Sequence, residues 1–223
     1  MTAKGAVPSG VDPTPEAQHI AELVDDWWSA SYPAPAARQV LAAAIDLFAE
    51  RGFFATSTRH IAQRVNMSTG ALYSYFRTKE ELLFEIVRVG HQDGVDALEE
   101  GLLSSTEPEA QLAAMVRGFT LWHARFHTVA KIVHDELYSL SEEHLATVVE
   151  LRRLTQSMTE SVLERGRDTG VFDPPDIPNT ARALLSLCID VSRWFRREHT
   201  STADQIADLY AQLALRMATA TSG

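Results

Sequence analysis

Apolar residues recur every three or four positions along most of the chain, the spacing that places them on one face of an α-helix. No stretch shows the sustained two-residue alternation of a half-buried β-strand. The pattern therefore predicts an all-α protein.

Nine main helices are expected after residue 36, separated by Gly, Pro and Asn residues that interrupt the apolar spacing. The first four are short or medium: a stripe from Val40 to Phe48 ending at Gly52, a helix beginning near Ser57, a helix carrying Leu72 and Phe76, and a long helix from Lys79 towards Leu103. The other five are expected at 108–126, 128–140, 142–169, 177–198 and 202–219.

The first 35 residues form a separate segment, rich in Pro, Ala, Ser and Gly and expected to be flexible. Within it, apolar residues from Ile20 to Trp28 have helical spacing and predict a short amphipathic helix. Two adjacent tryptophans, Trp27 and Trp28, need a cover, which we expect the body of the chain's own dimer to provide.

The net charge of −10 does not favour a nucleic-acid partner until its distribution is considered. Residues 1–35 carry −4 and residues 91–223 carry −8, but residues 36–90 carry +2. From Arg51 to Lys79 the chain holds five bases and no acid. Such a patch can attract phosphates, although chance clustering would give the same count.

The remaining composition is ordinary for a globular protein in a reducing compartment. Cys188 is the one cysteine, which excludes an internal disulfide framework. No apolar run approaches the roughly 20 residues needed to span a bilayer, and no secretion signal is present. We expect a cytoplasmic protein without a membrane partner.

Residues 57–76 meet the physical requirements of a helix-turn-helix. Asn66 tolerates the positive φ that the turn needs, and Ser68 can cap the following helix. That helix begins with the small residues Thr69, Gly70 and Ala71, which allow its backbone to enter a major groove.

The stretch from Ala36 to Leu83 resembles the DNA-binding domain of the TetR family of repressors. The resemblance is carried by Ala44-Ile45-Asp46-Leu47-Phe48-Ala49-Glu50-Arg51-Gly52-Phe53, Thr56-Ser57-Thr58-Arg59-His60-Ile61-Ala62, Ser68-Thr69-Gly70-Ala71-Leu72-Tyr73-Ser74-Tyr75-Phe76 and Lys79-Glu80-Glu81-Leu82-Leu83. It implies three parts: a flexible extension at 1–35, a DNA-binding domain at 36–83 and an effector-binding and dimerisation domain at 84–223.

The resemblance also implies roles for individual residues. Lys79 would contact a phosphate at the start of its helix, Arg59 a guanine or the backbone, and Thr69 and Gly70 the base edges. The chain departs from the family where His60 replaces an acid of the second helix's capping box and Asn66 replaces a glycine. The DNA-contacting residues predicted in this way are Ser57, Thr58, Arg59, Ser68, Thr69, Gly70, Tyr73, Ser74 and Lys79.

Two such heads on a two-fold axis would bind a near-palindrome in double-stranded DNA, so a homodimer is expected. The last two helices are the natural dimer surface, as in the TetR family, although their apolar stripes could equally face their own subunit's core. The residues expected at the interface are Leu184, Leu187, Val191, Ile206, Leu209, Tyr210 and Leu213.

The middle helices correspond to the family's effector pocket, whose walls are mostly apolar with few polar groups. His123 and His127 are four residues apart, which would also suit a metal pair, and Cys188 could act as a redox sensor; a buried inert role is the commoner one for both. We expect no metal or cofactor. The predicted ligand-binding residues are Trp122, Phe126, His127, His134, Tyr138, Arg193 and Trp194.

A fainter resemblance concerns the effector. The segments 165–172, 191–196 and 202–206 are similar to actinobacterial TetR regulators of lipid and sterol breakdown, which respond to acyl-CoA-type thioesters. Arg193, Arg196 and Arg197 could then bind CoA phosphates, unless they are surface arginines that balance an acidic body.

The preferred interpretation is a repressor released from its operator by a largely apolar small molecule. An activator, or a regulator without a small effector, would share all the head residues. An enzyme is disfavoured because no nucleophile elbow, phosphate loop or metal motif is present. A helical protein-interaction module would explain the tryptophans but leave the basic head unexplained.

Overall fold

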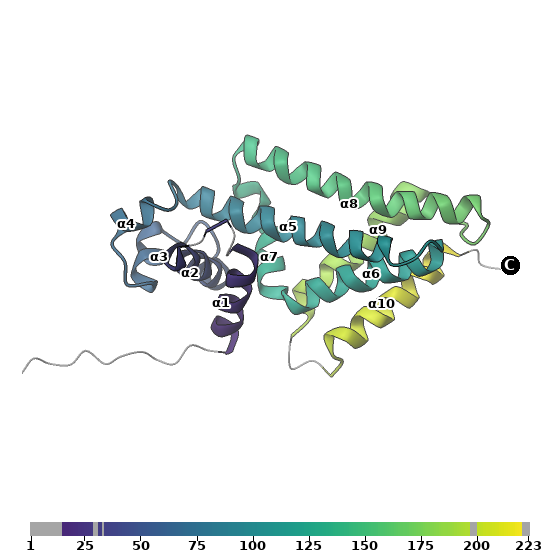
Figure 1. Cartoon of the computed structure of the whole chain (residues 1–223), viewed down its shortest axis with the longest axis horizontal. Helices are drawn as coiled ribbons and strands as arrows, with labels where there is room; N and C mark the ends of the chain where they lie inside the picture. Colours follow the sequence, from purple (N-terminus) through teal and green to yellow (C-terminus); the bar gives the residue numbers. More distant parts are fainter. Residues whose placement is uncertain (1–14, 29–30, 33, 197–199, 220–223) are drawn as a thin grey trace, which may run out of the picture. The chain divides into compact units, whose positions relative to one another are not determined.

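The computed structural model describes residues 15–28, 31–32, 34–196 and 200–219, and every regular element within these ranges is helical, as predicted (Figure 1). The chain divides into two compact units, Met1–Lys79 and Glu80–Gly223. None of the described helices is long and apolar enough to cross a membrane. The elements are α1 (Pro15–Trp28), α2 (Pro35–Arg51), α3 (Thr58–Arg64), α4 (Thr69–Tyr73), α5 (Lys79–Leu103), α6 (Pro108–Arg125), α7 (His127–Asp135), the 3₁₀ helix η1 (Leu137–Ser139), α8 (Glu142–Asp168), α9 (Ile177–Trp194) and α10 (Ala203–Ala218).

The N-terminal helix α1 belongs to the first unit, where it packs against α2. Its apolar face, including Trp28, is buried within the chain itself. Arg38 of α2 secures it by pairing with Asp25 at 2.5 Å and donating to the carbonyl of Tyr32 at 2.7 Å. The expectation that a dimer body covers Trp28 is therefore wrong, and the flexibility predicted for residues 1–14 lies outside the described residues.

The helix-turn-helix has the caps and the turn that the sequence predicts. Asn66 takes a φ of 52°, and the Ser68 hydroxyl accepts the N–H of Ala71 at 3.1 Å. At α3, the Ser57 hydroxyl accepts the N–H of His60, while His60 Nδ1 accepts the N–H of Ser57. The histidine thus completes the capping box in place of an acid, because a neutral ring nitrogen is also an acceptor.

Helix α4, the second helix of the helix-turn-helix, is shorter than predicted, since it ends at Tyr73 and not near Phe76. Phe76 lies in the segment between α4 and α5 and is fully buried, with its ring 5.1 Å from that of Tyr32. Sequence spacing alone does not show whether a buried aromatic residue such as Phe76 is the last residue of a helix or lies just after its end.

The second unit is built around α6, which packs against α8, α9 and α10 (Figure 1). Helix α5 comes so close to α6 at Gly101 that a Cβ there would meet the backbone N of Met115 at 2.5 Å. Arg117 of α6 clamps α10 by pairing with Asp204 at 2.9 Å and Asp208 at 2.6 Å. Helix α6 is therefore the central helix of this unit, in contact with all three helices that follow η1 in the sequence.

Two predicted helices differ in their ends. The element expected at 128–140 is divided into α7 and η1, with Glu136 between them. The element expected at 177–198 ends at Trp194, because Phe195 turns to an extended conformation with ψ of 138°. Residues 197–199 lie outside the described residues.

Candidate functional site

The first candidate site is the surface formed by α3, α4 and their flanking residues in the first unit. One hydrogen bond links its two helices, because Thr58 Oγ1 lies 3.2 Å from Tyr73 Oη. The predicted contact residues are all at least partly accessible: Ser57, Arg59, Ser68, Gly70, Tyr73 and Ser74 are exposed, and Thr58, Thr69 and Lys79 are half-buried. The side chains proposed for phosphate and base contact are therefore accessible to an outside partner.

Gly70 lies near the start of α4 without any packing need for a glycine. A Cβ built there would have a single neighbour within 4 Å, the Ser68 hydroxyl at 3.9 Å, and Gly70 itself is exposed. The hydroxyls on either side are occupied internally, with Ser68 capping α4 and Ser74 donating to the carbonyl of Ala71 at 2.6 Å. An external partner can therefore approach the backbone closely at Gly70.

Lys79 joins the start of α5 to the loop between α2 and α3. Its Nζ donates to the carbonyl oxygens of Phe53 and Thr56, both at 2.6 Å, and lies 3.9 Å from the centre of the Phe53 ring. Lys79 therefore has a structural role inside the head as well as the predicted phosphate contact, which stays a prediction.

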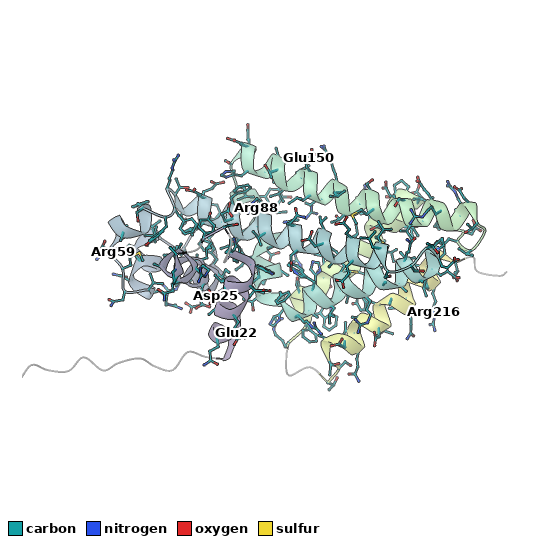
Figure 2. The ribbon with its side chains drawn as sticks, in the orientation of Figure 1. Glu22, Asp25, Arg59, Arg88, Glu150 and Arg216 are labelled. Atoms are coloured by element: carbon teal, nitrogen blue, oxygen red, sulfur yellow. The ribbon has the colours of Figure 1, made fainter. Side chains whose placement is uncertain are left out.

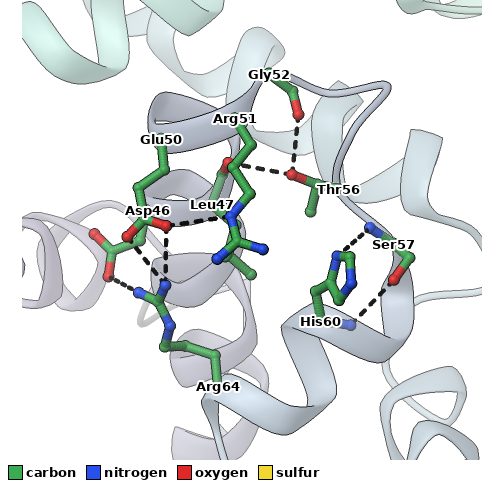
Figure 3. Close-up of polar contacts among 9 residues, drawn as sticks. All are labelled: Asp46, Leu47, Glu50, Arg51, Gly52, Thr56, Ser57, His60 and Arg64. Carbon is green, nitrogen blue, oxygen red and sulfur yellow. Dashed lines mark hydrogen bonds and ion pairs between the residues drawn. The ribbon is translucent and has the colours of Figure 1, made fainter.

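Thr56 is a positioning residue that the sequence did not single out. It is 1% exposed, and its hydroxyl lies within hydrogen-bond distance of the carbonyl oxygens of Leu47, at 3.1 Å, and Gly52, at 2.9 Å (Figure 3). Its own carbonyl accepts a hydrogen bond from Lys79. It holds the loop that presents the cap of α3. Nothing in the sequence around Thr56 distinguishes a buried threonine from one exposed in a loop.

The basic patch is smaller than the sequence count. Figure 3 shows Arg64 of α3 turned towards α2, where it pairs with Glu50 at 3.0 Å and Asp46 at 3.4 Å. Arg51 also pairs with Glu50, at 3.5 Å. Arg59 is different, because it is exposed on α3 and has no hydrogen bond or ion pair with any residue that the structure describes (Figure 2).

The second candidate site is a cluster of three histidines in the second unit, contributed by α5, α6 and α7. His123 Nε2 lies 3.0 Å from His134 Nε2, and the ring of His91 meets the ring of His134 edge-on at 5.4 Å between centroids. The Nδ1 atoms of His91 and His123 lie 2.9 and 2.7 Å from the backbone carbonyls of Val87 and Phe119. Aromatic rings complete the surroundings, with Trp122 4.7 Å from the ring of His123.

Burial keeps this cluster uncharged at neutral pH. Loss of solvent lowers the pKa of His91 to about 4 and that of His123 to about 3. The pKa of His134 is also lowered, first by burial and then by the charge that His123 would carry. The low dielectric disfavours the imidazolium form of each ring, so all three act as neutral hydrogen-bonding groups.

The structure brings only part of the predicted ligand-binding set together. Trp122 and His134 belong to the histidine cluster. Phe126 and His127 are half-buried, with the Phe126 ring 6.0 Å from that of Trp122 and the His127 ring 6.1 Å from that of Phe195. Tyr138 does not join them, since it is 94% exposed on η1. Arg193 and Trp194 are also exposed, and Arg193 pairs with Asp135 at 2.7 Å. His91 is the member of the cluster that sequence reasoning missed.

Two alternatives from the sequence gain no support. His123 and His127 direct their Nδ1 atoms to the backbone carbonyls of Phe119 and Ala124, and within the described ranges no group of three or more His, Cys, Asp or Glu is arranged to hold a metal ion. Cys188 is buried, and burial raises the pKa of its thiol to about 12, which disfavours the reactive thiolate.

The predicted dimer residues are divided between two faces of α9 and α10. Leu184, Val191 and Ile206 lie in the chain's own core, and Tyr210 is half-buried against it. Leu187, Leu209 and Leu213 are 42%, 48% and 37% exposed. With Trp194, 36% exposed, and Met217, 37% exposed, these leucines make the outer side of α9 and α10 apolar.

Two family models match the chain. "Bacterial regulatory proteins, tetR family" matches residues 40–86, and "Tetracyclin repressor-like, C-terminal domain" matches residues 105–218. Together they include both candidate sites except His91.

Individual proteins show the same similarity. The transcriptional repressor KstR2 of Rhodococcus jostii is 31% identical over 79% of this chain and 88% of its own length. A tetR-family regulatory protein from Rhodococcus RHA1 has a TM-score of 0.80 and 39% identity, over 85% of this chain and all of its own. The regulator AibR, solved with isovaleryl coenzyme A and operator DNA, has a TM-score of 0.72 and 25% identity, over 80% of this chain and 97% of its own.

Proposed function

Because the chain belongs to the TetR family of bacterial transcriptional regulators, we propose that it is a homodimeric repressor released from a near-palindromic operator by a small, largely apolar effector. The effector that we favour is an acyl-CoA-type thioester.

The observation that carries the DNA-binding part is the capped helix-turn-helix with an accessible recognition helix. Asn66 and Ser68 set the turn and the start of α4, Gly70 leaves its backbone approachable, and Arg59 stands exposed beside it. Arg59 supplies a planar donor group for guanine or phosphate, while the Tyr73 hydroxyl reaches a phosphate. The acidic remainder of the protein limits binding to DNA at other surfaces.

The effector part is supported by the second unit and by its relatives. The buried rings of Phe119 and Trp122, both from α6, lie against the ring of His123 and give the cluster apolar neighbours, as in a small-molecule site. KstR2 is a repressor, and AibR was solved with a short acyl-CoA. The exposed Arg193 and Arg196 are candidates for the CoA phosphates.

Release follows from a shift between two conformations of the dimer. Only one of them would present two heads at the spacing of the operator half-sites. An effector that binds the other conformation more tightly lowers the affinity for the operator. By linkage, the operator lowers the affinity for the effector by the same factor.

The test is fluorescence anisotropy of a labelled operator with purified protein and a panel of acyl-CoAs of increasing chain length. The proposal expects at least one thioester to release the DNA while free coenzyme A does not. Operator binding that no thioester alters would favour the second candidate, an activator or a regulator without a small effector, which uses the same head.

A further inference from the structure

The hydrogen atoms of the three-histidine cluster can be placed by accounting for donors and acceptors. A carbonyl oxygen only accepts, so the Nδ1 atoms of His91 and His123 must donate to Val87 and Phe119. Each of these neutral rings then has an unprotonated Nε2. Because His123 Nε2 accepts, the His134 Nε2 that lies 3.0 Å away must carry the hydrogen and donate it.

This assignment leaves two lone pairs pointing into buried surroundings. His134 Nδ1 and His91 Nε2 are both buried, and neither has a hydrogen-bond partner among the residues that the structure describes. Buried polar atoms are nearly always satisfied, because leaving one without a partner costs the free energy of removing it from water. Both atoms are acceptors, so each can take a hydrogen bond from a donor.

The lone pairs lie in a closely packed, apolar part of the second unit. A Cβ at Gly90, the residue before His91, would lie 2.6 Å from Val133, the residue before His134. The ring of Phe119 is 4.5 Å from that of His123. A ligand that is apolar except at one hydroxyl suits this neighbourhood, and its single hydrogen would satisfy one of the two acceptors.

We propose that His91 and His134 form a polar subsite for the effector, which accepts a hydrogen bond from an alcohol hydroxyl on an otherwise hydrocarbon body. An amide fits less well, because its carbonyl would need a donor that the cluster does not offer. A carboxylate or ketone brings only acceptors and would face the lone pairs. A cation would lose its hydration in this surrounding. This inference rests on the effector-controlled function proposed above and specifies the ligand's chemistry.

The first test compares matched ligands on the full-length protein. Isothermal titration is performed with 3-hydroxydecanoyl-CoA and decanoyl-CoA, and with 3-hydroxydecanoate and decanoate. The subsite predicts that the hydroxylated member of a pair binds about tenfold more tightly, the value of one neutral hydrogen bond. His91→Phe and His134→Phe should reduce that preference. His144→Phe, at a half-buried ring that pairs with Glu80 and lies outside the predicted ligand-binding set, should retain it.

The second test needs neither a variant nor a ligand. A long-range ¹H–¹⁵N spectrum of histidine-labelled protein distinguishes the two neutral tautomers of each ring. We expect Nδ1–H for His91 and His123 and Nε2–H for His134, and the unprotonated nitrogen of His91 or His134 should shift with the hydroxylated probe alone. Any other set of tautomers would overturn the inference, even if a phenylalanine variant failed to fold.

The outcomes separate this inference from the function on which it depends. Equal affinities within each pair overturn the subsite while the acyl-ligand function stands. If none of the four probes binds, the acyl-ligand function fails, and the subsite for this ligand class fails with it. A preference that survives in both phenylalanine variants places the hydroxyl elsewhere and also overturns the proposal.

Discussion

The ammonium group of Lys79 lies 2.6 Å from the carbonyl oxygen of Thr56, so the first residue of α5 is bonded to the loop that precedes α3. The same nitrogen also donates to Phe53. The TetR resemblance implies a phosphate contact for Lys79. In this chain Lys79 also has a structural role, because it connects the start of α5 to the loop before α3. The two roles make separate predictions.

Lys79→Ala should lower the free energy of unfolding by about 1–3 kcal/mol, because hydrogen bonds from a charged donor are lost and two half-buried carbonyls lose their partner. It should also weaken DNA binding uniformly across sequences and reduce the salt slope by about one. Urea unfolding and anisotropy at several salt concentrations measure the two effects. If the salt slope of DNA binding were unchanged while stability fell, Lys79 would have the structural role but no phosphate contact.

Gly70→Ala should have opposite effects on folding and on DNA binding. The methyl group has open space within the head, and alanine is the better helix residue, so the free energy of unfolding should be unchanged or rise by up to about 1 kcal/mol. Operator affinity should fall about tenfold or more if α4 enters the groove at this point. Equal affinities of the two proteins would remove Gly70 from the DNA surface.

Leu213→Glu should convert the dimer to a monomer, because it places a charge on the exposed apolar face of α9 and α10. Its neighbour Gln212 is also exposed, so Gln212→Glu adds the same charge beside that face and serves as the control. Sedimentation should report about 24.7 kDa for the first variant and twice that for the second. A Leu213→Glu dimer would place the interface elsewhere.

The histidine cluster should make the protein less stable as the pH falls below about 6.5. The folded-state pKa of His91 is lowered to about 4, so between these values the unfolded chain binds a proton that the folded chain excludes. Stability is full above pH 6.5 and declines by about 1.4 kcal/mol per pH unit for each such histidine.

The comparison variant for the pH dependence is His91→Gln, which removes one titrating group. Urea unfolding at pH 7.5, 6.5 and 5.5 should give a shallower decline for this variant than for the native chain. Parallel declines would mean that His91 titrates alike in both states and is not buried as described.

Much of the head follows from short-range sequence rules. The positive φ of Asn66 and the cap at Ser68 depend on residues within three positions of one another, so their chemistry is visible in the sequence. The pairing of Arg64 with Glu50 is not, because it joins two helices that the turn brings together. The sequence count therefore overstated the positive charge available to DNA.

In the second unit, even less of the packing could be predicted from the sequence. Leu184 and Leu187 both fit an apolar helical stripe, yet one is 2% exposed and the other 42%, because the stripe is wider than the face that α6 and α8 cover. Periodicity does not separate core from interface when both are apolar. His91 could not be joined to His123 from the sequence, since nothing in the spacing of residues on different helices indicates which rings meet.

The central claim is that this chain is a dimer that binds a specific operator, and selection of genomic fragments by the purified protein tests it most directly. We predict recovery of a near-palindrome with two half-sites about one helical turn apart, or a multiple of that spacing. Recovery of random fragments, or of none, would contradict the claim and show that the head does not recognise an operator by itself.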